Sequence, residues 1–169
     1  ISAGPNSQLR LSGNNTSAGT TTITAGAIEI ASDHALGASS AGTVVNSGFS
    51  LALLGGITVP EPITINGAGF GGLGAIFNGN GNNAINGAMT LGTNSIIGSL
   101  SGTLTFNGAI SDGASSFALT KVYSGTVAFS NANTYDGGTT INGGVLAISN
   151  GSALGTGSVS ISSGAELDL

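Results

Sequence analysis

Apolar and polar residues alternate with a period of two along several short runs of this chain. The clearest runs cover residues 22–24, 27–31, 63–65, 103–106, 126–129 and 145–148. Because successive side chains of a strand point to opposite faces, this alternation predicts strands with one buried face. Turn signals separate the runs, with Asn-Gly pairs starting at Asn66, Asn78, Asn80, Asn86, Asn107, Asn142 and Asn150. Asn and Gly tolerate the left-handed backbone of tight corners. The pattern predicts an all-β chain of short strands and tight corners.

One long segment of the chain is repeated. Residues 9–37 align without a gap on residues 127–155, at a constant offset of 118. For example, Thr21-Thr22-Ile23 falls on Thr139-Thr140-Ile141. With two residues removed the match extends further, which defines two copies at 9–53 and 127–169 and intervening coils at 54–126. A repeat of this kind predicts stacked coils, because a single coil cannot bury its apolar side alone.

A stack of coils predicts a parallel β-helix, or β-solenoid, that covers residues 1–169 as one domain. At roughly 20–25 residues per coil, the chain would form about seven coils. With strands about 4.8 Å apart, the rod would be about 35 Å long. A β-sandwich needs no sequence repeat. A membrane barrel needs longer strands and aromatic girdles, and only 5% of these residues are aromatic.

The two ends of the chain resemble each other. Residues 1–4 followed by 9–11 resemble residues 161–164 followed by 167–169, so the chain starts at about the phase of the repeat at which it stops. A stacked filament and an excerpt of a longer protein would both explain this. Pro5 lies near the N-terminal edge, where proline typically blocks strand pairing. The candidate residues for end-to-end stacking are Ile1, Leu9, Leu11, Ile161, Leu167 and Leu169.

The amino-acid composition argues against several classes of partner and chemistry for this chain, and three features of it matter most. Only 5% of the residues are charged, against about 25% in ordinary globular domains. The net charge is -5, and the basic residues are Arg10 and Lys121, so a nucleic-acid partner is not expected. The absence of cysteine excludes disulfides and thiolate chemistry. No stretch reaches about 18 uninterrupted apolar residues, so we expect no membrane insertion of this segment.

The C-terminal third carries a motif of spaced glycines and strand residues. It includes Leu119-Thr120-Lys121, Asn133-Thr134-Tyr135, Gly137-Gly138-Thr139-Thr140-Ile141 and Ala153-Leu154-Gly155. This pattern resembles the autotransporter-associated β-strand repeat, also called the passenger-associated transport repeat. The resemblance covers 119–169 strongly and 9–53 more weakly. It implies a right-handed parallel β-helix, export to the bacterial cell surface, and a stalk or passenger role. It implies no catalytic residues.

Few residues suggest chemistry. His34 beside Asp33 is the only histidine, and its counterpart in the second copy is Ser152 in a turn, so an exposed turn residue is expected. Glu166 and Asp168 alternate with apolar residues and would solubilise one outward face. Gly67, Gly69 and Gly72 satisfy G-x-G-x-x-G, but no helix follows, so residues 66–74 are interpreted as a corner or bulge. We therefore predict no catalytic, cofactor-binding or metal-ligating residue.

Two functions remain open from the sequence. The first is a non-enzymatic stalk or passenger segment of a secreted or cell-surface protein, stacked on further coils of a longer chain. The second is a subunit of an extracellular filament, stacked head to tail on copies of itself. A polysaccharide-active or adhesive β-helix ranks third, because general acid-base work needs positioned groups with tuned pKa values.

Overall fold

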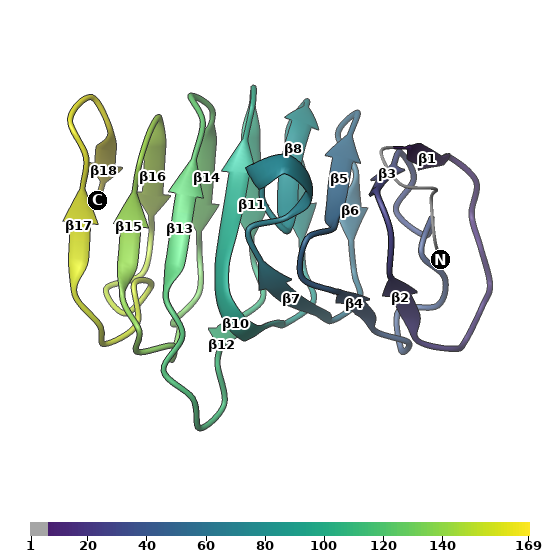
Figure 1. Ribbon diagram of the computed structural model, residues 1–169, viewed down its shortest axis with the longest axis horizontal. Helices are drawn as coiled ribbons and strands as arrows, with labels where there is room; N and C mark the ends of the chain where they lie inside the picture. Colours follow the sequence, from purple (N-terminus) through teal and green to yellow (C-terminus); the bar gives the residue numbers. More distant parts are fainter. Residues whose placement is uncertain (1–6) are drawn as a thin grey trace.

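The structure is a computed structural model that describes residues 7–169. Every pair of neighbouring strands in this part of the chain is parallel. Strands from successive turns lie side by side along one axis, with β1 and β2 at one end and β17 and β18 at the other (Figure 1). The predicted all-β parallel solenoid is confirmed.

The strands lie on three faces, which the chain visits in order. The first face holds β2 (Thr21–Ile23), β4 (Thr43–Val45), β7 (Ile63–Gly67), the start of β10 (Met89–Ser99) and β12 (Ile110–Ser111). The second face holds β1 (Gln8–Leu11), β3 (Ala27–Ile30), β5 (Ser50–Leu54), β8 (Ile76–Asn80), the end of β10, β13 (Leu119–Val122), β15 (Thr139–Ile141) and β17 (Val159–Ile161). The third face holds β6 (Thr58–Val59), β9 (Asn83–Ile85), β11 (Thr103–Phe106), β14 (Thr126–Phe129), β16 (Val145–Ile148) and β18 (Glu166–Asp168).

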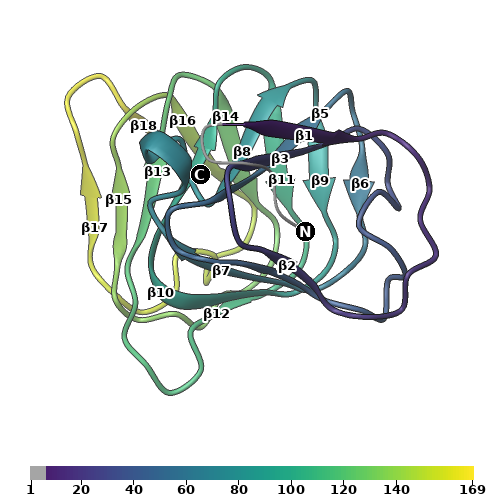
Figure 2. The same cartoon turned by 45° about the vertical axis from the view of Figure 1, so that its right-hand side comes forward.

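The first and second faces form one continuous sheet, and the third face forms a separate sheet (Figure 2). The long strand β10 joins the first two faces, and its pairing register with β7 shifts between Leu91 and Ser95. The second face contains eight strands. The solenoid therefore has about eight turns, one more than the sequence predicted.

The core is built from columns of side chains that point inward from successive turns. On the second face, register partners place one such column through Leu9, Ile28, Leu51, Ile76, Ile97, Lys121, Ile141 and Ile161. On the third face, Ile85, Phe106, Phe129 and Ile148 form another. Phe106 and Phe129 are fully buried and meet edge to face, with ring centroids 5.7 Å apart. Stacking in register therefore produces one continuous core rather than separate clusters.

All six predicted strand runs are strands in the structure, but one predicted corner is not a corner. Asn78 starts an Asn-Gly pair, yet this pair lies inside β8, whereas Asn66-Gly67 ends β7 with Gly67 in a left-handed conformation at φ 74°. Asn78 is fully buried. Its amide is satisfied within the protein, so here asparagine serves as an interior polar residue and not as a turn residue.

The two sequence copies do not occupy the same faces. Thr21–Ile23 forms β2 on the first face, whereas its counterpart Thr139–Ile141 forms β15 on the second face. In the same way β3 lies on the second face and its counterpart β16 on the third. Leu9 to Ile161 spans seven steps of about 22 residues each, so an offset of 118 residues falls between five and six turns. The second copy is therefore rotated forward by one face.

A glycine-rich strap lies outside the second face. It covers residues 68–74 and contains the 3-10 turn η1 (Phe70–Gly72), which crosses in front of β8 in Figure 1. The Ser50 hydroxyl accepts a hydrogen bond from the Phe70 N–H at 2.8 Å and donates to the Gly74 carbonyl at 2.7 Å. This matches the predicted corner or bulge at 66–74. None of the described residues forms a helix that is long and apolar enough to cross a membrane.

Candidate functional sites: the end strands and a buried lysine

The C-terminal end of the solenoid exposes apolar side chains. On β17, Val159 and Ile161 are 41% and 48% exposed, and Leu169 after β18 is 87% exposed. Leu169 also lines a hollow of about 250 Å³ together with Ile148 and Asn150. At this end the aliphatic side chains of the inward columns are exposed. The backbone N–H and C=O groups on the outer side of β17 and β18 have no neighbouring strand among the described residues. Such an edge is a template for pairing with a further strand.

The N-terminal end is built differently. Leu9 and Leu11 on β1 are partly buried against the core, while Ile1 and Pro5 lie outside the described residues. The first two turns carry no strand on the third face, so β6 is the edge strand of that sheet. The Asp33 carboxylate accepts the Thr58 N–H of β6 at 2.8 Å. A carboxylate at this position blocks strand pairing at the edge.

The five predicted stacking residues that lie within the described part of the chain are therefore spread over different sheets. Leu9, Leu11 and Ile161 belong to or border strands of the second face, whereas Leu167 lies on the third face and Leu169 follows it. The sequence similarity between 9–11 and 167–169 thus relates β1 to β18, which lie on different faces. The two ends of the chain therefore have similar sequences but lie on different faces of the solenoid.

His34, Glu166 and Asp168 are the titratable residues that the sequence singled out for possible chemistry. His34 lies in an exposed turn, as expected, and lines an open hollow of about 480 Å³ with Asp33, Ser32 and Asn14. Within residues 7–169 no cluster of three or more His, Asp or Glu side chains is positioned to hold a metal ion. Glu166 and Asp168 are exposed on β18, on the outward side that the alternation predicted.

Glu61 is a buried carboxyl that the sequence did not single out. It is 2% exposed and accepts a hydrogen bond from the Thr43 hydroxyl. Burial raises the pKa of Glu61 above its ordinary value, while the Thr43 hydrogen bond and the nearby His34 lower it in part. This carboxyl joins the β4 turn to the corner that follows β6. Its single hydroxyl partner and its burial suit a structural role rather than proton transfer.

Lys121 is the most unusual side chain of the described chain. It stands in the aliphatic column of the second face and is 1% exposed. Its ammonium donates hydrogen bonds to the carbonyl oxygens of Tyr123 and Gly125, each at 2.6 Å, and to that of Gly143 in the next turn. Tyr123 has a left-handed backbone with φ 69°, which a non-glycine residue rarely adopts. The ammonium therefore holds a strained corner and ties it to the following turn.

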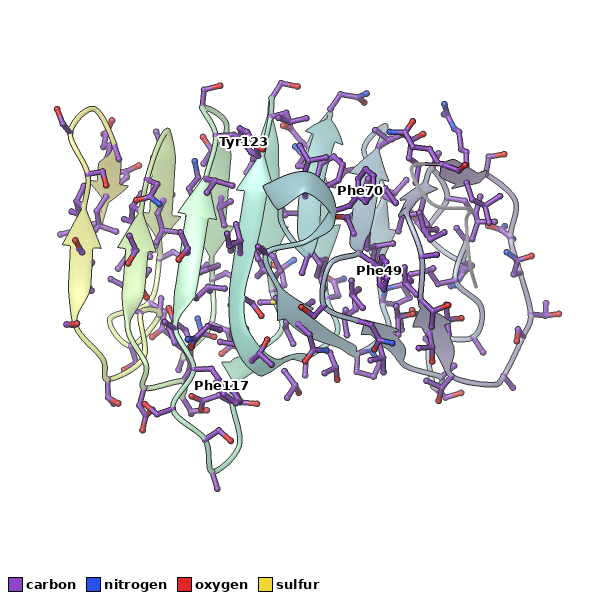
Figure 3. All side chains as sticks on the ribbon, viewed as in Figure 1. Phe49, Phe70, Phe117 and Tyr123 are labelled. Atoms are coloured by element: carbon purple, nitrogen blue, oxygen red, sulfur yellow. The ribbon has the colours of Figure 1, made fainter. Side chains whose placement is uncertain are left out.

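The corner around Lys121 also explains two neighbouring glycines. A Cβ on Gly144 would lie 2.5 Å from the Lys121 ammonium, and a Cβ on Gly98 would lie 3.0 Å from the Tyr123 ring. Figure 3 shows Tyr123 at this corner, with Phe70 of the strap further along the same side. The sequence pointed to Lys121 only as one of two basic residues and as part of the motif Leu119-Thr120-Lys121. Lys121 points inward because it lies two residues after the buried Leu119 on the same strand. Its charge alone would have predicted a side chain that points to solvent.

Burial of Lys121 predicts a pH-dependent stability. Burial lowers the pKa of Lys121 from 10.5 to about 8, and the three carbonyl oxygens oppose this shift because they favour the ammonium. Between pH 8 and 10.5 the unfolded chain binds more protons than the folded chain, so stability rises with pH. From pH 7 to 9.5 the free energy of unfolding should rise by up to about 2 kcal/mol relative to Lys121→Met.

Urea unfolding of both proteins at several pH values, followed by circular dichroism, measures this difference. The range should stop at pH 9.5, because burial raises the pKa of Tyr135 to about 12. Stability from Tyr135 is present below pH 10 and is lost above it in both proteins, so this range keeps both proteins in the part of the pH scale where Tyr135 stays protonated. The compared quantity is the free energy of unfolding of the unchanged protein minus that of Lys121→Met. If this quantity stays constant or falls as the pH rises, the buried ammonium of Lys121 does not destabilise the fold.

Comparison with known proteins tests the resemblance. The family model "Passenger-associated-transport-repeat" matches residues 7–30 and 119–148. The chain carries two passenger-associated transport repeats. The first match runs from the start of the described chain through β1, β2 and β3, and the second runs from β13 to β16. Lys121 and the strained Tyr123 corner lie inside the second match.

A curated relative of this repeat-bearing chain is "Adhesin BmaC autotransporter" of Brucella suis biovar 1 (strain 1330). The two are 33% identical over 130 residues, which are 73% of this chain and 4% of the relative. The chain thus corresponds to a small part of that protein's length. No solved structure gave a significant match.

Proposed function

We propose that this chain is a non-enzymatic rod segment of a secreted or cell-surface passenger. The observation that carries the proposal is the unbroken core. Inward columns run from β1 to β17 on the second face and from β9 to β18 on the third face. Stacked parallel strands about 4.8 Å apart give such a rod a length of about 35 Å. Two passenger-associated transport repeats and the similarity to an autotransporter adhesin support a place at the cell surface.

Replacement of the segment tests the rod function. In the surface protein that carries residues 1–169, they would be exchanged for about eight turns of an unrelated parallel β-solenoid. A rod segment predicts unchanged surface exposure, measured by protease accessibility on intact cells, and unchanged attachment to host cells. Deletion of the segment without replacement is the control and should lower surface exposure. Lost attachment at normal surface exposure would instead assign an adhesive surface to this segment.

A filament of stacked copies is the second candidate, and the exposed edge of β17 and β18 favours it. A filament subunit of this chain would form long fibres of uniform width in electron microscopy of the purified protein. Short separate particles would contradict it. Head-to-tail stacking of two identical copies would leave β18 without a partner strand. β18 of one copy would meet the first turns of the next copy, and in the described chain those turns have no strand on the third face.

A further inference from the structure

Buried polar groups form a continuous line through the corner between the second and third faces. The line begins at Asn83, whose side-chain oxygen accepts the N–H groups of Gly56 and Ile57 at 2.8 and 2.7 Å. The Asn83 amide donates to the side-chain oxygen of Asn78. Asn78 in turn donates to the Ser99 hydroxyl at 3.3 Å. These contacts already connect three successive turns.

The line continues into the second transport repeat. The Ser99 carbonyl accepts the Gly125 N–H at 2.8 Å, and the Gly125 carbonyl accepts the Lys121 ammonium. Lys121 also reaches Gly143 one turn further on. We call the four side chains of this line the polar spine: Asn83, Asn78, Ser99 and Lys121. Each is at most 1% exposed. The spine spans five turns, from the corner at Gly56 to the corner at Gly143.

A second polar ladder at the next corner differs in exposure. Between the third and first faces, Asn107 donates to the side-chain oxygen of Asn86 at 2.8 Å and accepts from the Ser130 hydroxyl at 2.9 Å. These contacts are exposed to solvent, so water can replace each partner. A buried polar group that loses its partner has no such replacement and costs the full desolvation penalty. The ladder is therefore a natural control for the spine.

The apolar core alone does not define how the turns align. A strand that slips by two residues along its neighbour keeps its apolar side chains inward, because the side-chain period is two. The transport repeat itself also accepts more than one position. Its copy at 21–30 occupies the first and second faces, and its copy at 139–148 occupies the second and third. Misaligned turns would therefore still satisfy the apolar pattern of this sequence.

We propose that the polar spine is the register lock of this solenoid. A slip of two residues leaves the apolar columns filled but separates the buried amides, hydroxyl and ammonium from their partners. Lys121 joins two successive turns within the second transport repeat and so fixes the alignment of β14 with β16. The proposal concerns alignment of turns and holds for a rod, a filament or an adhesive surface alike.

Cysteine pairs read the register directly, because the chain has no cysteine of its own. Ala128 and Ala147 are register partners on β14 and β16. The aligned reporter is Ala128→Cys with Ala147→Cys, and the slipped reporter is Ala128→Cys with Val145→Cys. In the otherwise unchanged protein the aligned pair should form a disulfide at least about tenfold faster than the slipped pair, since disulfides require a narrow range of Cα separations.

The spine variant and its control decide the proposal. With Lys121→Met, we expect the ratio of the two rates to fall to within about threefold, because the slipped state no longer leaves an ammonium unpaired. With Ser130→Ala, which removes a rung of the exposed ladder, the ratio should stay unchanged. An unchanged ratio in Lys121→Met, or an equal fall in Ser130→Ala, would overturn the register lock.

A second variant keeps the test decisive where Lys121→Met does not fold. Ser99→Ala removes a buried hydroxyl of the spine, and it matches Ser130→Ala in the atoms deleted. Its reporters lie on the turns that the Ser99 hydroxyl joins, with Ala84→Cys paired to Thr105→Cys in register or to Thr103→Cys two residues away. A fall in the rate ratio for Ser99→Ala, but not for Ser130→Ala, supports the lock. Equal ratios in the two variants reject it.

Discussion

Replacing Phe106 by alanine should lower the free energy of unfolding by about 3–5 kcal/mol, the usual cost of truncating a buried phenylalanine. Phe106 is 1% exposed and packs edge to face on Phe129 of the next turn. Ile85 precedes it in the same inward column. The columns are continuous, so the cavity would lie between turns and would uncouple the two halves of the rod. Urea unfolding followed by circular dichroism measures the loss.

Phe70→Ala is the matched control for Phe106→Ala. Phe70 is half-buried on the strap outside the second face and is not part of the core cluster. Its truncation should cost less than about 1 kcal/mol, as for most sites away from the core. Phe106→Leu, which keeps most of the volume, should lose about 1–2 kcal/mol. Equal effects of Phe106→Ala and Phe70→Ala would contradict a core that runs continuously through the turns.

The fold was predictable because local pattern and global packing agree along most of the chain. At Thr103–Phe106 and Thr126–Phe129 the apolar residues alternate with threonine or alanine, and the structure buries the apolar ones in both strands. Stacking of coils then follows from the repeat, since no coil can bury its apolar side by itself. Each short strand therefore needed only its own alternation to be recognised.

The buried polar residues were not predictable in the same way. Asn78 precedes glycine and has the signature of a turn, yet it lies in β8 with its amide bonded to the next turn. Lys121 carries a charge, which is normally solvated, and only the carbonyls of its own corner and of Gly143 make its burial tolerable. Those carbonyls converge only when the coils are stacked. No local sequence signal contains that information.

The sequence also did not predict that the second repeat is rotated by one face relative to the first. Alignment at an offset of 118 residues suggests equivalent positions, but coil lengths vary from 19 residues (Leu9 to Ile28) to 25 (Leu51 to Ile76). Strand β10 adds to this variation, because it bends across two faces through Gly92-Thr93-Asn94. Face assignment depends on the sum of all preceding coil lengths, so small local differences accumulate.

Gly108→Ala should destabilise the protein by about 3 kcal/mol, at the upper end of overpacking effects. A Cβ at this position would lie 2.0 Å from the Gly87 carbonyl oxygen of the previous turn, and Gly87 itself approaches the Glu61 carbonyl in the same way. Three successive corners are thus stacked through backbone alone. The obstacle is a carbonyl inside the stack, so it cannot rotate away as a side chain would.

Gly151→Ala is the matched control for Gly108→Ala, since an added Cβ there meets no atom within 4 Å. It should leave stability unchanged or raise it by about 0.4–1 kcal/mol, because alanine restricts the unfolded chain. Thermal unfolding of both variants beside the unchanged protein compares the two effects. A Gly108→Ala protein as stable as Gly151→Ala would mean that neighbouring turns can separate at this corner. The close backbone stacking of the third-to-first corner would then not be a requirement of the fold.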